Sequence, residues 1–195
     1  MPHVCPWWVS YFHNIPLRRL VHDPQKMLAP HVREGMIVVD IGSGAGYFSI
    51  PMAAMVGESG LVIAADIQAK ALDLLARRAR KAGLIGRLRL HQCQPGKVGL
   101  ETPVDFVLLA NVVHETPDPQ AFLQEVCAML KAGGQCYLTE PVMRVSASQF
   151  QETVKRAERA GLTVAARPRV PLSRTVLLSK VVSRKEDHLQ IDKGH

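Results

Sequence analysis

The sequence predicts one α/β domain built on a mainly parallel sheet with helices on both faces. From residue 36 onward, apolar strand-like runs alternate with segments of helical periodicity, a pattern typical of parallel sheets. A glycine-rich turn follows the first of these runs, in "VVDIGSGAGYFSI". The chain has 195 residues, 47% of them hydrophobic, which is enough for one buried core.

The pattern places the elements in order along the chain. Strands are expected at residues 36–41, 61–65, 88–92, 104–110 and 135–139. Helices are expected at 47–56, at 68–82, from the Asp118 cap to Gly133 and Gly134, and at 147–160.

Two further apolar runs, at 162–167 and 174–180, are joined by a short loop that contains Pro168 and Pro171. A parallel return would need a crossover of about a dozen residues. The sheet is therefore expected to end in an antiparallel hairpin. Residues 182–195 have little to bury and are expected to fray.

Composition narrows the classes of protein. No apolar run reaches the roughly 18–20 residues that span a bilayer, and the N-terminus lacks the apolar centre of a signal peptide, so a cytoplasmic location is expected. The four cysteines fit no metal-binding spacing, so no metal is expected.

The net charge of +7 is partly concentrated between Lys70 and Lys81. It permits RNA or an anionic substrate as partner, although a solvated surface explains it more simply.

Three glycines two residues apart, Gly42, Gly44 and Gly46, tolerate positive φ and let a ligand approach the backbone. The spacing differs from the dinucleotide fingerprint because Tyr47 stands where the third glycine belongs. No Gly-Lys-Ser/Thr follows, as a Walker loop would require. Asp40, just before the turn, would repel a phosphate and favours a ligand that carries an ammonium or sulfonium group.

A second acid, Asp66, follows the second strand 26 residues after Asp40. A carboxylate in this place can accept hydrogen bonds from both hydroxyls of a ribose. A ligand with a ribose, an amino group and no phosphate is S-adenosylmethionine.

The motifs in this order resemble those of class I S-adenosylmethionine-dependent methyltransferases, including the methyltransferase-domain families of quinone biosynthesis. The matching segments are "VVDIGSGAGYFSI", "IAADIQ", "VDFVLLANVVHETPDP" and "MLKAGGQCYLTEP". The resemblance implies a Rossmann-like three-layer αβα sandwich, with a seven-stranded sheet ordered 3-2-1-4-5-7-6 and strand 7 antiparallel. The methyltransferase domain is expected at 31–181, between an aromatic segment at 1–30 and the tail at 182–195.

The resemblance also implies which residues hold the cofactor across the carboxyl ends of strands 1, 2 and 4. Gln94 stands where the family often has an acid, so its contact with adenine would lack charge. The implied set is Asp40, Gly42, Ser43, Gly44, Gly46 and Tyr47 at the methionine end, Asp66 and Ile67 at the ribose, Gln94 and Pro95 at the adenine, and Asn111 and Val112 after the fourth strand.

The residues expected to contact the methyl acceptor follow strands 4 and 5. His114 is expected either to act as a general base or to order its loop, because a base is needed only when the acceptor must lose a proton early. Glu115 and Glu140 are expected at the same edge.

Trp7, Trp8 and Tyr11 precede the fold. They are expected either to cover the acceptor as a lid, since aromatic faces suit cations and flat substrates, or to pack on the sheet edge or a partner subunit. A homodimer is one way in which the chain could complete its site.

The sequence thus favours a methyltransferase that acts on a small or medium-sized acceptor. RNA methylation is the main alternative, although the signature of base-amino methyltransferases is absent from "ANVVHE". A protein acceptor and a non-catalytic cofactor-binding subunit are further alternatives. The acceptor atom is not given by the sequence.

Overall fold

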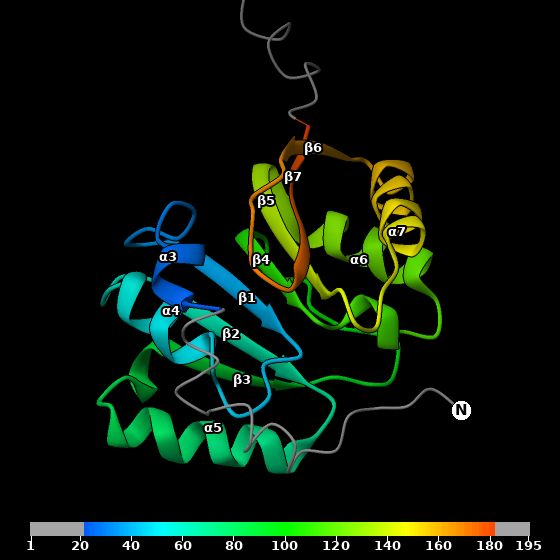
Figure 1. Cartoon of the computed structure of the whole chain (residues 1–195). Helices are drawn as coiled ribbons and strands as arrows, with labels where there is room; N and C mark the ends of the chain where they lie inside the picture. Colours follow the sequence, from blue (N-terminus) through cyan, green and yellow to red (C-terminus); the bar gives the residue numbers. More distant parts are fainter. Residues whose placement is uncertain (1–21, 182–195) are drawn as a thin grey trace, which may run out of the picture.

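The computed structural model describes residues 22–181 (Figure 1). One seven-stranded sheet has the order β3-β2-β1-β4-β5-β7-β6. All neighbours pair in parallel except β7, which is antiparallel to both β5 and β6. The predicted order and the terminal hairpin are confirmed. The strands are β1 (Ile37–Ile41), β2 (Leu61–Asp66), β3 (Leu88–Gln92), β4 (Val104–Ala110), β5 (Leu130–Pro141), β6 (Leu162–Ala166) and β7 (Ser173–Lys180).

Helices cover both faces of the sheet, as predicted (Figure 1). On one face lie α3 (Pro24–Leu28), α4 (Ser49–Met55) and α5 (Ala69–Lys81), and on the other lie α6 (Pro119–Met129) and α7 (Ala147–Arg159). Alternate residues of each central strand point to opposite faces. Val38 and Phe106 therefore belong to the core beneath α3 and α4, and Val39 and Val107 belong to the core beneath α6 and α7. No helix among the described residues is long and apolar enough to cross a membrane.

Most element boundaries lie within two residues of the sequence prediction, but the junction between α6 and β5 does not. Helix α4 begins at Ser49, two residues later than expected, because the glycine turn extends to Phe48. Strand β5 begins at Leu130, directly after α6, and not beyond Gly134. Leu130 pairs with Val104, and the register then shifts so that Gln135 pairs with Phe106. The glycines therefore form an irregularity within the strand instead of ending the helix.

The glycine turn after β1 is tied to the end of β2. The amides of Gly42 and Ser43 donate to the carbonyl of Ala65, at 2.8 and 3.1 Å. Gly42 has φ of 74°, which L side chains rarely adopt. A Cβ there would also lie 2.4 Å from Cγ2 of Val112, which follows β4. The turn therefore needs glycine at this position both for its backbone and for its packing.

We predict that Gly42→Ala destabilises the fold more than Gly83→Ala does. Gly83 has a similar φ of 70°, but nothing lies within 4 Å of its added Cβ. The free energy of unfolding of the control should fall by about 1–2 kcal/mol because alanine is strained in the left-handed region. That of Gly42→Ala should fall by roughly a further 1–3 kcal/mol because of the clash with Val112. Denaturant unfolding measures both, and equal losses would show that Val112 yields without cost.

Candidate functional site

A cavity of about 370 Å³ opens at the carboxyl ends of β1, β2, β3 and β4. Its volume lies within the range of small-molecule sites. Twelve of the residues predicted from the sequence line it: Gly42, Ser43, Gly44, Tyr47, Asp66, Ile67, Gln94, Pro95, Asn111, Val112, His114 and Glu115.

Three predicted residues do not line this cavity. Asp40 is 1% exposed, and its carboxylate accepts a 2.5 Å hydrogen bond from the Ser49 hydroxyl, so it holds the first residue of α4. Gly46 lets α5 approach, since a Cβ there would lie 2.9 Å from Cγ of Leu75. Glu140 is also 1% exposed and bonds to His114, as described below.

The aromatic residues predicted as a lid, Trp7, Trp8 and Tyr11, lie outside the described residues.

The carboxylate of Asp66 joins the end of β2 to the glycine turn. One oxygen accepts from the amide of Gly44 at 2.8 Å and the other from that of Gln68 at 2.9 Å. Burial raises the pKa of this carboxyl group, while these backbone hydrogen bonds oppose the rise. Each carboxylate oxygen has two acceptor sites. Asp66 can therefore hold the turn and still accept hydrogen bonds from a ligand in the cavity.

Ser43 provides a polar group that needs a ligand. The residue is 6% exposed and lines the cavity, and its hydroxyl has no hydrogen-bond partner among the described residues. Buried polar groups are normally satisfied. A polar ligand beside the bare glycine turn would satisfy this hydroxyl, as the amino-acid end of S-adenosylmethionine could. Together with Asp66, these residues fit that cofactor.

The far end of the cavity is formed after β3. Gln94 and Lys97 exchange two backbone hydrogen bonds of 3.2 and 3.1 Å in a tight turn, and Gly96 of this turn packs against Pro117. Cys93 also lines this end. Burial raises the pKa of its thiol to about 12, so the group is neutral and a poor nucleophile.

At the opposite end of the cavity, the imidazole of His114, 19% exposed, pairs with the buried carboxylate of Glu140. His114 lies in a short 3₁₀ turn after β4, and Glu140 lies near the end of β5. One oxygen of Glu140 accepts from the backbone amide of His114 at 3.2 Å, and the other lies 2.5 Å from ring Nδ1. With Nδ1–H donating to Glu140, Nε2 carries the free lone pair of the neutral ring. The pair therefore has the arrangement of an oriented general base.

Charges around His114 set its proton affinity. The hydrogen bond to Glu140 is the main cause that raises the pKa of His114, and burial opposes it. Glu115, with an oxygen 3.8 Å from Nε2, raises it further, while Arg144 lowers it. The imidazole thus becomes a stronger base than an isolated histidine.

Sequence reasoning missed several lining residues, among them Ala45, Phe48, Gln68, Cys93, Lys97, Thr116, Phe122 and Arg144. Ala45, Phe48 and Gln68 flank predicted residues and could have been found from that proximity. Arg144 carries no such signal, because its position depends on where β5 ends and how the chain turns afterwards.

Known proteins match the chain over this fold. The family model described as "Methyltransferase domain" matches residues 32–184. The ubiquinone/menaquinone biosynthesis C-methyltransferase UbiE of Haemophilus ducreyi is 28% identical over 110 residues, 56% of this chain and 42% of that protein. The tRNA 5-carboxymethoxyuridine methyltransferase of Escherichia coli K12 is 32% identical over 118 residues, 59% of this chain and 44% of that protein. The matches thus span less than half the length of these curated relatives.

Solved structures agree on the fold. A SAM-dependent methyltransferase from Aquifex aeolicus has a TM-score of 0.79 and 25% identity, with 90% of this chain and 98% of that chain covered. The [4+2]-cyclase SpnF has a TM-score of 0.70 and 15% identity, with 85% and 81% covered, and that likeness concerns the fold alone. Because the family model covers most of the sequence, the chain belongs to the methyltransferase-domain family.

Proposed function

We propose that this protein transfers a methyl group from S-adenosylmethionine to a small-molecule acceptor that must lose a proton. The observation that carries the proposal is that His114, oriented by Glu140, lines the same cavity as Ser43 and Asp66. A non-catalytic binder would need the ligand-binding turn but no oriented base. The pair therefore favours an enzyme.

The chain's own residues divide the work. The glycine turn, Ser43 and Asp66 would hold the cofactor, which supplies a methyl group on a sulfonium centre, a good leaving group. Nε2 of His114 takes the acceptor's proton, and Glu140 keeps the ring oriented and stabilises the imidazolium that forms. The walls of the cavity align the acceptor with the methyl group and exclude water. This alignment supplies most of the acceleration of such a displacement.

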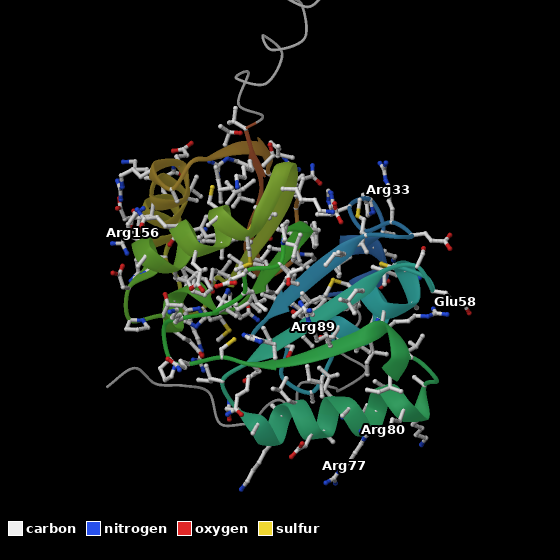
Figure 2. The ribbon with its side chains drawn as sticks, turned by 180° about the vertical axis from the view of Figure 1, so that it is seen from behind. Arg33, Glu58, Arg77, Arg80, Arg89 and Arg156 are labelled. Atoms are coloured by element: carbon white, nitrogen blue, oxygen red, sulfur yellow. The ribbon has the colours of Figure 1, made fainter. Side chains whose placement is uncertain are left out.

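RNA, the main alternative, is supported less well. The basic cluster of α5 includes Arg77 and Arg80, which lie on the side of the helix that faces away from the sheet (Figure 2). Helix α5 begins beside the cavity, at the end of β2, and runs away from it. At about 1.5 Å per residue, Arg80 lies roughly 15 Å from its first turn. Phosphate contacts on this side of α5 would therefore lie outside the cavity.

The decisive experiment is transfer of labelled methyl from S-adenosylmethionine into metabolite, RNA and protein fractions of the source cell. We expect label in the metabolite fraction. Label in RNA or protein would replace the small-molecule proposal, and no transfer despite cofactor binding would favour a non-catalytic subunit.

Asp66→Ala should weaken binding of S-adenosylhomocysteine at least about tenfold, because charge-assisted hydrogen bonds contribute roughly 1.5–3 kcal/mol each. Asp73→Ala, which removes an exposed acid on α5, is the matched control and should leave the dissociation constant unchanged. Calorimetry measures the dissociation constants of both variants. In the same assay, NAD should bind the parent protein more weakly than S-adenosylhomocysteine does. Equal affinities for Asp66→Ala and the parent would place the ribose elsewhere.

For an oxygen acceptor, the rate should rise with pH through the pKa of His114, since only the deprotonated ring accepts a proton. Glu140 raises this pKa, so Glu140→Gln should move the rising limb to lower pH. It should also lower the plateau about tenfold or more, because the imidazolium loses its counter-charge.

Glu115→Gln is the comparison variant for this profile. It should shift the limb in the same direction by less, because Glu115 is a weaker cause of the raised pKa. Initial rates over a pH series measure these profiles. If the rising limb of the pH–rate profile does not move in Glu140→Gln, His114 is not the general base.

We propose further that Trp7, Trp8 and Tyr11 act as a lid. The carbonyl of His22 accepts from the Tyr47 hydroxyl at 2.6 Å, and Nε2 of His22 lies 2.7 Å from Oγ of Ser173. Residues 1–21 thus join the described chain beside a lining residue. Met143 and Leu172, 91% and 63% exposed, lie after β5 and before β7 and offer an apolar surface at this end of the sheet.

Deleting residues 1–13 should leave affinity for S-adenosylhomocysteine within a few fold but lower turnover about a hundredfold, through lost alignment and water exclusion. Deleting residues 182–195 is the control and should preserve turnover. Steady-state kinetics with the acceptor from the labelling experiment test this, and full activity of the shorter protein would contradict the lid.

A further inference from the structure

The sheet order separates two ends of the cavity. The glycine turn follows β1, Asp66 ends β2 and Gln94 follows β3, so these residues lie over strands 1, 2 and 3, while Asn111 and Val112 follow β4. His114 follows β4, and Pro141 and Arg144 come from the end of β5 and the turn after it. The β4–β5 end is therefore the acceptor end, if the proposed function holds.

The turn that carries Arg144 is held firmly. The amides of Arg144 and Val145 both donate to the carbonyl of Pro141, at 3.1 and 3.0 Å. Val145 is buried, and its carbonyl accepts a 2.9 Å hydrogen bond from Nε of Arg174 on β7. Arg144 is thus presented by a fixed turn and not by a loose loop.

Arg144 and Lys97 are the only lysine or arginine side chains among the described residues that line the cavity. Lys97 belongs to the β3 end. Arg78 and Lys131, by contrast, have partners: Arg78 donates to the carbonyl of Ala45, and Lys131 pairs with Asp105. The Arg144 side chain has no hydrogen-bond or ion-pair partner within residues 22–181. Its five N–H donors are therefore available to a ligand.

Arg144 and His114 lie at the same end of the cavity. Both line the cavity, and the positive charge of Arg144 lowers the pKa of His114, opposite to the effect of the two acids Glu115 and Glu140. Glu140 is buried beneath the imidazole and directs its oxygens to His114. An acceptor in this cavity therefore lies in a space lined by both His114 and Arg144.

We infer that Arg144 binds an oxyanion of the acceptor, a carboxylate or a phosphate, while the atom to be methylated faces His114. This rests on the proposed function. A guanidinium binds either group through two parallel hydrogen bonds, which fixes orientation as well as position. The acceptor is thus an anionic small molecule with a separate protonated nucleophile, and Arg144 is a specificity-determining residue.

The test uses the small-molecule extract of the source cell, divided by strong anion exchange into a retained anionic pool and a flow-through pool. Labelled methyl should enter the retained pool. Arg144→Gln should raise the acceptor KM about ten- to hundredfold, with kcat changed less, and Arg144→Lys should fall in between. Arg77→Gln, which removes an exposed arginine of α5, is the matched control and should behave as the parent.

Phosphatase treatment of the retained pool distinguishes the two sources of the oxyanion. Loss of acceptor capacity from that pool identifies a phosphate monoester, and its survival is the result expected for a carboxylate; both agree with the inference. Calorimetry with S-adenosylhomocysteine should give Arg144→Gln a dissociation constant within about twofold of the parent's.

Three results would overturn the inference. Label confined to the flow-through pool would mean a neutral or cationic acceptor. An unchanged acceptor KM in Arg144→Gln would mean that the oxyanion is held elsewhere. Weaker binding of S-adenosylhomocysteine with an unchanged acceptor KM would assign Arg144 to the cofactor. Label in no fraction at all would instead contradict the proposed methyltransferase function.

Discussion

The site depends on the register that holds β1 between β2 and β4. Asp40 pairs with Ala64 on one side and with Leu108 on the other, so the three strands end at one level. The turns that follow therefore meet, and Gly42, Asp66 and Asn111 come to one edge. The bonds from Gly42 and Ser43 to Ala65, and from Gly44 to Asp66, then fix one turn against the next strand. A slip by one residue would turn each side chain to the opposite face.

Most of the fold could be predicted from the sequence, because its causes are local. Gly42, Gly44 and Gly46 all have positive φ, and Asp118 caps α6 by accepting hydrogen bonds from the amides of Gln120 and Ala121. The antiparallel hairpin followed from the length of one loop. Asp66 could be placed because it ends a strand, where a short side chain has few directions open to it.

The candidate site could be predicted less well, because the direction of a side chain depends on register and on neighbouring elements. Asp40 and Asp66 look alike in sequence, yet Asp40 points toward α4 and binds Ser49 while Asp66 lines the cavity. Glu140 was expected at the acceptor, but the register of β5 places it beneath His114. That register includes the shift between Leu130 and Gln135, which no local pattern indicates.

The position of β7 has a consequence for the order in which the sheet is completed. Although β7 is the last described strand in sequence, it lies between β5 and β6. As the chain leaves the ribosome, β5 therefore keeps an unpaired edge until residues 173–180 have emerged. An open strand edge can pair with other chains. The pairing of β5 with β7 closes this edge, but it joins segments far apart in sequence and therefore forms slowly. Until β7 has emerged, the edge of β5 is therefore the side of the sheet that stays open to another chain.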